Sequence, residues 1–192
     1  MTPSTFARIL KLIGMDSNAY SLNNLLLPLA LFSLILIHSC AKQAESAARE
    51  EATATASGPF FTGPNSLIAE QRVNLTDLIE GVPLNAEKLQ SVSLEKVQVN
   101  LRAIDSLDFS YFNNASLSIV SSDLEMISIA TLNPIETDGQ SISLTASQEA
   151  DLSDYFKAES YSLVLDLGLN EDLYQDELGA NILLDLSITY TE

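Results

Sequence analysis

The side chains in this sequence that could do chemistry are almost all carboxylates. Aspartate and glutamate number 26 against nine lysines and arginines, which gives a formal net charge of −17. The one histidine is His38 and the one cysteine is Cys40, so residues 41–192 contain neither, and the chain has no tryptophan. Serine–histidine and cysteine–histidine catalysis, thiol redox chemistry and the imidazole or thiolate ligands of zinc, copper and haem are therefore excluded from residues 41–192.

Carboxylates alone can still hydrolyse glycosides. Two carboxyl groups about 5 Å apart, or roughly 6.5–9.5 Å apart, are sufficient for that reaction. The spacing of the acids does not identify such a pair, and the seven glycines form neither a P-loop nor a dinucleotide fingerprint. We therefore expect no enzymatic activity and no cofactor, and an acid-pair glycosidase is the least favoured alternative.

The densest group of oxygen donors lies in the segment DLGLNEDLYQDE, residues 166–177. Calcium prefers oxygen ligands of this kind. The spacing is not that of an EF-hand loop, so a solvated acidic connection is the first interpretation and a calcium site is the alternative. The candidate ligands are Asp166, Asn170, Glu171, Asp172, Asp176 and Glu177.

Cys40 follows the most apolar stretch of the chain. The apolar run from Leu25 to Ile37 covers 13 residues, whereas a helix that crosses a bilayer needs roughly 20. Arg8 and Lys11 precede the run, and the small residue Ser39 follows it. A basic region, a short apolar region and a small residue before a processing site are typical of an export signal.

The junction Ile37-His38-Ser39-Cys40 resembles the lipobox of bacterial lipoproteins. Ile37, Ser39 and Cys40 match that pattern, and His38 departs from it. The resemblance covers the first 40 residues. It implies that residues 1–39 are a signal peptide and that Cys40 carries the lipid, whose acyl chains contribute about 0.8 kcal/mol per buried CH₂. It also implies a cell-envelope protein, and Ala41 after the cysteine implies the outer membrane.

The rest of the chain divides into a tether and a body. Residues 40–58 contain no large apolar side chain after Cys40, so we expect a lipidated N-terminus and a flexible tether. Residues 59–192 are long enough for one domain with a single core. We therefore predict three parts: a signal peptide at 1–39, a tether at 40–58 and an acidic domain at 59–192.

The body shows the period of two that is typical of half-buried strands. Residues 161–169 and 182–190 each carry an apolar side chain at every second position, and these side chains lie on one face of the predicted strand. In residues 91–104 the apolar positions change phase at Glu95 and Lys96, which predicts a β-bulge or a break between two strands. Shorter strands are expected around Leu117, in residues 125–132 and in residues 140–146.

Short helical turns and two aromatic pairs complete the pattern. Asn85 and Asp151 are positioned to cap helical turns, and a third turn is expected within residues 105–112. The pairs at 111–112 and 155–156 are expected to close strand ends over the core, with a binding surface as the alternative.

Seven or eight short strands predict an all-β fold, an antiparallel β-sandwich with a small β-barrel as the alternative closure. The pattern resembles the small β-sandwich domains of bacterial envelope lipoproteins. We expect a membrane-anchored, non-enzymatic binding or structural interaction module, with a calcium-dependent or carbohydrate-binding domain as the alternative. The expected partners are the membrane, through the lipid, and envelope proteins or glycans. Nucleic acid is excluded because the acidic body repels phosphates.

Overall fold

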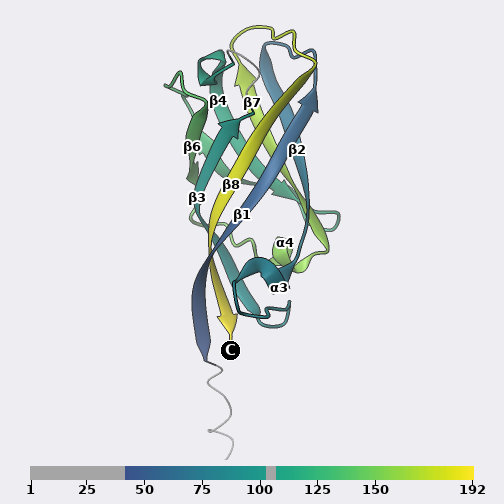
Figure 1. The fold of residues 1–192 in the computed structure, drawn as a ribbon, viewed down its shortest axis with the longest axis vertical. Helices are drawn as coiled ribbons and strands as arrows, with labels where there is room; N and C mark the ends of the chain where they lie inside the picture. Colours follow the sequence, from purple (N-terminus) through teal and green to yellow (C-terminus); the bar gives the residue numbers. More distant parts are fainter. Residues whose placement is uncertain (1–41, 103–106) are drawn as a thin grey trace, which may run out of the picture. The chain divides into compact units, whose positions relative to one another are not determined.

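The computed structural model describes residues 42–102 and 107–192, which form a closed antiparallel β-barrel (Figure 1). The strands are β1 (Gln43–Ser57), β2 (Gly63–Arg72), β3 (Leu89–Leu101), β4 (Phe112–Val120), β5 (Ile127–Leu132), β6 (Ser141–Ala146), β7 (Ser160–Leu169) and β8 (Glu177–Thr191). The short helices α3 (Leu75–Leu78) and α4 (Ser153–Lys157) and the 3₁₀ turn η1 (Phe109–Tyr111) lie in the connections. The predicted all-β fold is confirmed.

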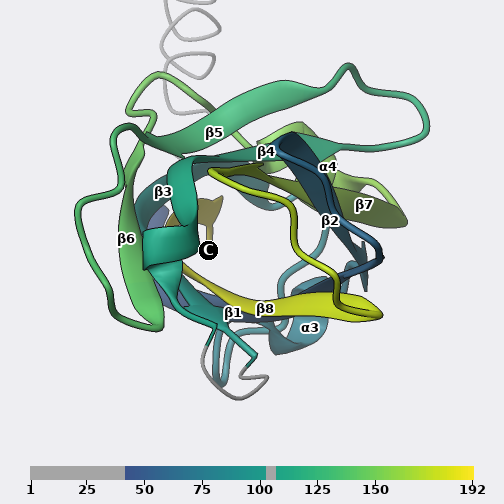
Figure 2. The ribbon, with the colours of Figure 1, turned by 90° about the horizontal axis from the view of Figure 1, so that it is seen from above.

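The barrel is closed by two strand pairings that contain few residue pairs, which we call the two joins. Around the ring the strand order is β1-β2-β7-β4-β5-β6-β3-β8 (Figure 2). β1 meets β2 at the single pair Thr55–Ile68, and β5 meets β6 at two pairs, whereas β1 pairs with β8 along its whole length. The ring therefore consists of two four-stranded halves, β2-β7-β4-β5 and β6-β3-β8-β1. Of the two predicted closures, the structure shows the barrel.

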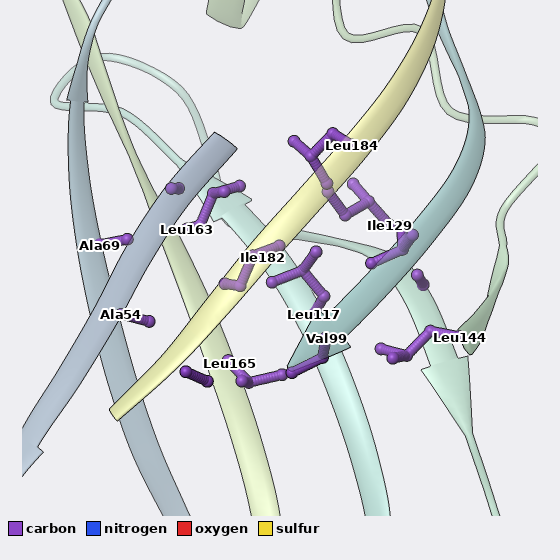
Figure 3. Packing of buried hydrophobic residues seen from close by; sticks show 14 of the residues in the cluster. Ala54, Ala69, Val99, Leu117, Ile129, Leu144, Leu163, Leu165, Ile182 and Leu184 are labelled. Atoms are coloured by element: carbon purple, nitrogen blue, oxygen red, sulfur yellow. The ribbon is translucent and has the colours of Figure 1, made fainter. Parts of the chain in front are cut away.

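The interior is filled by the alternating apolar rows that the sequence predicted. Leu163 and Leu165 of β7 and Ile182 and Leu184 of β8 point inward and are at most 1% exposed (Figure 3). Leu167 of β7 is fully buried as well. Because successive side chains of a strand face opposite sides, each of these strands contributes one row to the core. The barrel is thus packed by side chains, as expected for eight strands.

The phase change in β3 is a β-bulge. Leu94 pairs with Leu186 and Lys96 pairs with the next residue of β8, Asp185, so Glu95 is the extra residue. The bulge keeps both Leu94 and Val97 in the core, at 2% and 0% exposure. The predicted irregularity at Glu95 and Lys96 is confirmed.

The predicted flexible tether is wrong for residues 43–57, which form strand β1. Even-numbered residues of β1 face inward, and Ala52 and Ala54 are 4% and 0% exposed. No large apolar side chain is needed here, because the partner strand β8 supplies a full apolar row. The folded body therefore includes residues that the sequence pattern assigned to the tether.

The two ends of the barrel differ in what they carry. One end, the rim, is formed by residues 58–62, 107–111, 133–140 and 170–176, where β1, β3, β5 and β7 end. The opposite end, the terminal end, holds the start of β1, the end of β8, and both α3 and α4 (Figure 1). Within the described ranges, no helix has the length and apolarity needed to cross a membrane.

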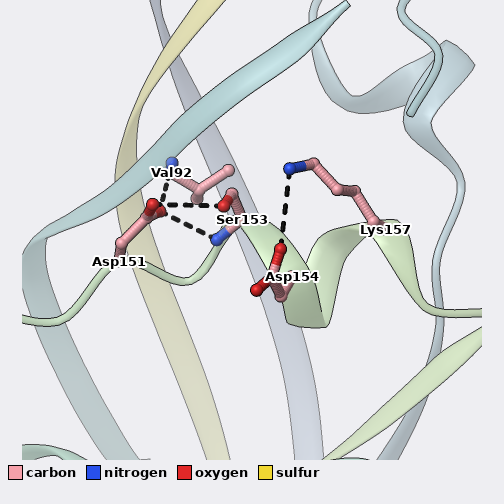
Figure 4. Close-up of polar contacts among 5 residues, drawn as sticks. All are labelled: Val92, Asp151, Ser153, Asp154 and Lys157. Carbon is pink, nitrogen blue, oxygen red and sulfur yellow. Dashed lines mark hydrogen bonds and ion pairs between the residues drawn. The ribbon is translucent and has the colours of Figure 1, made fainter. Parts of the chain in front are cut away.

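Asp151 joins α4 to the barrel wall from the position before the helix N-cap, which is Leu152 and not Asp151 as predicted. Its carboxylate accepts hydrogen bonds from the backbone nitrogen of Val92 on β3 at 3.1 Å and from that of Ser153 at 2.9 Å (Figure 4). The Ser153 hydroxyl donates a third, at 3.1 Å. One carboxylate therefore binds both the first residue of the helix and the backbone of β3.

We expect Asp151→Ala to lower the free energy of unfolding by about 1–2 kcal/mol, because it leaves the Val92 and Ser153 amides without their acceptor. Urea denaturation of the full chain measures this loss. Asp151→Asn is the matched control, since its carbonyl oxygen still accepts, and it should retain most of the stability. Equal losses for both variants would contradict the assigned role.

Candidate functional site

The structure does not bring the six predicted calcium ligands together. Asp166 accepts a hydrogen bond from the Ser66 hydroxyl, and Asn170 donates to the Ser110 carbonyl at 3.1 Å. Asp172 accepts from Thr62 instead. Glu171, Asp176 and Glu177 are exposed. Within residues 42–102 and 107–192, no group of three or more histidine, cysteine or acidic side chains is arranged to hold a metal ion.

Cys40, the predicted lipid attachment residue, and the rest of the lipobox-like junction lie outside the described residues. The first described residue is Lys42, directly before β1. The lipid attachment therefore stays a prediction.

The two aromatic pairs belong to the core. Phe112, Tyr155 and Phe156 are 1%, 6% and 2% exposed, and Tyr111 packs against the core while partly buried. The Phe156 ring lies 5.2 Å from that of Tyr161, centroid to centroid. The expectation that these pairs close the core is confirmed.

Among residues 42–102 and 107–192, the large aromatic side chains that face solvent are Phe61 and Tyr174, which are 60% and 78% exposed. They occupy two rim loops that are joined by a β-bridge between Phe60 and Leu173. Phe60 and Leu173 exchange backbone hydrogen bonds of 3.0 and 2.9 Å and are buried. Their chain neighbours Phe61 and Tyr174 therefore face outward as diagonal neighbours across the bridge, a separation that aromatic side chains can span.

Further hydrogen bonds fix these two loops to each other. The Gly58 amide donates to the Asp176 carbonyl at 2.9 Å, and the Thr62 amide and hydroxyl both donate to the Asp172 carboxylate at 2.9 Å. The Asn65 side chain of β2 donates to the Phe61 carbonyl at 2.8 Å, which holds loop 58–62 to the start of β2. We call the loops 58–62 and 170–176, with their two exposed aromatic side chains, the aromatic platform.

The rim around the aromatic platform is acidic. The bonds from the Thr62 backbone and hydroxyl hold the pKa of the Asp172 carboxyl below its ordinary value, which favours its charged form. The described part of the rim and the residues directly next to it contain seven acidic residues and one basic residue, Arg102. The acids are Asp108, Glu136, Asp138, Glu171, Asp172, Asp176 and Glu177.

Sequence reasoning missed the aromatic platform, although a signal for it was present. Phe60 and Phe61 are adjacent, so in extended backbone one of the two rings must face away from the core. Tyr174 lies in the acidic connection, where the oxygen donors were the residues singled out. What the sequence did not indicate is that these two segments lie side by side.

A second unusual group is the inward-facing carboxylate Glu50 of β1. Burial raises the pKa of Glu50 above its ordinary value. Burial also raises the pKa of Tyr161, and the nearby Glu50 charge raises it further. An inward-pointing charge on a strand that has a sparsely paired edge disfavours pairing with other chains, so this group suits a role in solubility.

Glu50 predicts a pH dependence of stability. Because its pKa is raised in the folded state, the folded protein holds the proton more tightly, and this stabilisation is lost as the pH rises from about 4.5 through the folded pKa. We expect Glu50→Gln to raise the thermal midpoint at pH 7 and to change it less at pH 4. The control is Glu51→Gln, which alters the exposed neighbour on the opposite face. A gain for Glu51→Gln as large as that for Glu50→Gln would contradict the burial argument.

Comparisons with known proteins show only distant structural likeness. No protein-family model matches the chain, and no curated protein matches it. A chain of Desmodium yellow mottle tymovirus is 8% identical with a TM-score of 0.31, covering 79% of this chain and 90% of that one. A structure of Tomato aspermy virus is 14% identical with a TM-score of 0.25, covering 84% and 92%. A structure titled for carbohydrate-binding modules of the β-sandwich superfamily is 8% identical with a TM-score of 0.28, covering 75% and 56%. Likeness at this level carries no argument about function.

Proposed function

We propose that this chain is a non-enzymatic binding module, anchored to the bacterial outer membrane by a lipid on Cys40. The observation that carries the binding role is the aromatic platform, in which hydrogen-bonded loops hold Phe61 and Tyr174 in solvent. Exposed aromatic side chains on a rigid framework are typical of binding surfaces, because little conformational entropy is lost when a partner binds. The anchor is supported by the lipobox-like residues Ile37, Ser39 and Cys40.

The short distance in sequence between Cys40 and β1 limits how far the barrel can lie from a lipid on Cys40. Gln43 lies three residues after Cys40, and three residues span at most about 11 Å. A lipid on Cys40 would therefore keep the terminal end of the barrel close to the bilayer. The strand β1 has 15 residues, which extend roughly 50 Å at about 3.3 Å per residue. The rim and its aromatic platform lie at the end of the barrel opposite this attachment.

The anchor is tested by replacing the thiol that accepts the lipid. We expect Cys40→Ser to move the protein out of the membrane fraction or to leave it unprocessed, and mass spectrometry of the wild-type N-terminus should show a lipidated Cys40. Ala41→Ser is the matched control, because it changes the neighbouring residue and keeps the thiol. A Cys40→Ser protein that stays in the membrane at the wild-type size and abundance would refute the anchor.

Carbohydrate binding is the second candidate, since Phe61 and Tyr174 offer flat faces to a sugar ring. Binding of wild-type protein to a glycan array, together with loss of that binding in the double variant Phe61→Ser/Tyr174→Ser, would favour it. The calcium-dependent form of this candidate requires that added calcium raise the thermal midpoint or strengthen the glycan signal. An unchanged midpoint and signal would remove the calcium requirement.

A further inference from the structure

We infer that the aromatic platform is a docking surface for a segment of another protein that is rich in lysine or arginine. This inference rests on the proposed binding role and adds the location of the site and the chemistry of its partner. It does not depend on the lipid anchor.

The first step is the exposure of the two rings. The exposed large hydrophobic side chains in the described part of the chain are Phe61, Ile68, Met126 and Tyr174. Only Phe61 and Tyr174 among these are aromatic, and they share one hydrogen-bonded unit, whereas Ile68 lies on β2 and Met126 at the terminal end. The two exposed rings are therefore carried by one hydrogen-bonded unit of the rim, whereas Ile68 and Met126 are isolated exposed residues.

The second step is the charge around the rings. Glu171, Asp172, Asp176 and Glu177 flank Tyr174 in sequence, and all four are exposed. The ion pairs within the described ranges lie elsewhere: Lys42–Glu192, Arg49–Asp185 and Lys157–Asp154. These four carboxylates are thus free of ion pairs with described residues and can act on a cationic partner.

The third step is the match between aromatic faces and cations. The face of a tyrosine or phenylalanine ring attracts an ammonium or guanidinium group within about 6 Å of its centre. Carboxylates beside the ring strengthen that attraction and increase the rate of encounter with basic segments. A neutral glycan would use the rings and leave the charges unused, and an anionic lipid surface would be repelled. Charge complementarity therefore favours a basic protein segment.

The test measures binding of a fluorescein-labelled peptide of alternating arginine and glycine to the full chain in detergent, by fluorescence anisotropy. We expect Phe61→Ser/Tyr174→Ser and Glu171→Gln/Asp176→Asn/Glu177→Gln each to weaken binding by about tenfold or more. Two matched controls change the same kinds of residue elsewhere: Ile68→Ser/Met126→Ser, and Asp123→Asn/Glu125→Gln/Glu149→Gln at the terminal end. Both controls should bind as the wild type does, and thermal melting should show that each variant is folded.

Equal weakening by the two acidic triple variants would overturn the inference, because it would show attraction to the overall negative charge. Absence of peptide binding would overturn it as well, as would a platform that binds neutral oligosaccharides in place of the peptide. Failure of the proposed function is distinguishable. Oligosaccharide binding leaves a binding module with another ligand, and a Cys40→Ser protein that stays in the membrane fraction at the wild-type size and abundance removes the anchor alone.

Discussion

Leu165→Ala is expected to lower the free energy of unfolding by about 2–5 kcal/mol, the usual cost of truncating a fully buried leucine. Leu165 is on β7, where it pairs with Leu67 of β2 on one side and with Leu117 of β4 on the other. All three residues are fully buried. The ladders on both sides restrict how far these strands can close the gap that the lost methyl groups leave.

The size of this loss matters because a domain of this kind is stabilised by only about 5–15 kcal/mol. Urea denaturation of the full chain gives the change from the shift in midpoint. The matched control is Val164→Ala on the same strand, whose side chain faces outward and is half-buried; it should cost less than about 1 kcal/mol. Similar losses at the two positions would contradict the assignment of inward and outward faces.

Gly58→Ala is expected to destabilise the protein by about 2–4 kcal/mol and to disturb the aromatic platform. A Cβ atom at position 58 would lie 1.9 Å from the backbone carbonyl oxygen of Gln175 and 2.9 Å from the Phe60 ring. The loops must separate to relieve this overlap, which strains the hydrogen bonds from Gly58 to Asp176 and between Phe60 and Leu173. Thermal melting measures the loss of stability, and the anisotropy assay should show weaker binding of the arginine–glycine peptide.

Gly139→Ala provides the control for a rim glycine without such an overlap. A Cβ atom there would lie 3.4 Å from the Thr137 hydroxyl oxygen, the nearest atom outside its immediate chain neighbours. We expect a change within about 0.5 kcal/mol and unchanged peptide binding. A Gly58→Ala protein as stable as Gly139→Ala would show that the two platform loops are not packed as closely as described.

The aromatic platform and the unpaired part of β1 differ in the kind of side chain that they expose. Hydrogen bonds between loops 58–62 and 170–176 hold the backbone that carries the two exposed rings of the aromatic platform. Along β1, where pairing with β2 is limited to Thr55–Ile68, the inward carboxylate of Glu50 and exposed charges such as Arg49 discourage further strand pairing. The two exposed rings therefore lie at the rim, whereas charged side chains lie along the part of β1 that does not pair with β2.

The sequence by itself determined the elements whose signal is local. Alternating side chains in residues 161–169 and 182–190 identified β7 and β8 together with their buried faces, because a strand with one buried face has a period of two. The phase change at Glu95 identified the bulge for the same reason. The helical turn after Asp151 was visible because a carboxylate there can accept nearby backbone hydrogen bonds, although the N-cap position itself is Leu152.

Only the tertiary structure decided what depends on segments far apart in the chain. Residues 43–57 are a strand because β8 supplies both a complete ladder and the large apolar side chains that β1 lacks, and no property of the alanine-rich segment reveals that partner. The choice of barrel over sandwich depended on three residue pairs at the two joins, since both closures require the same alternation. The aromatic platform likewise exists only because the bridge between Phe60 and Leu173 joins loops more than a hundred residues apart.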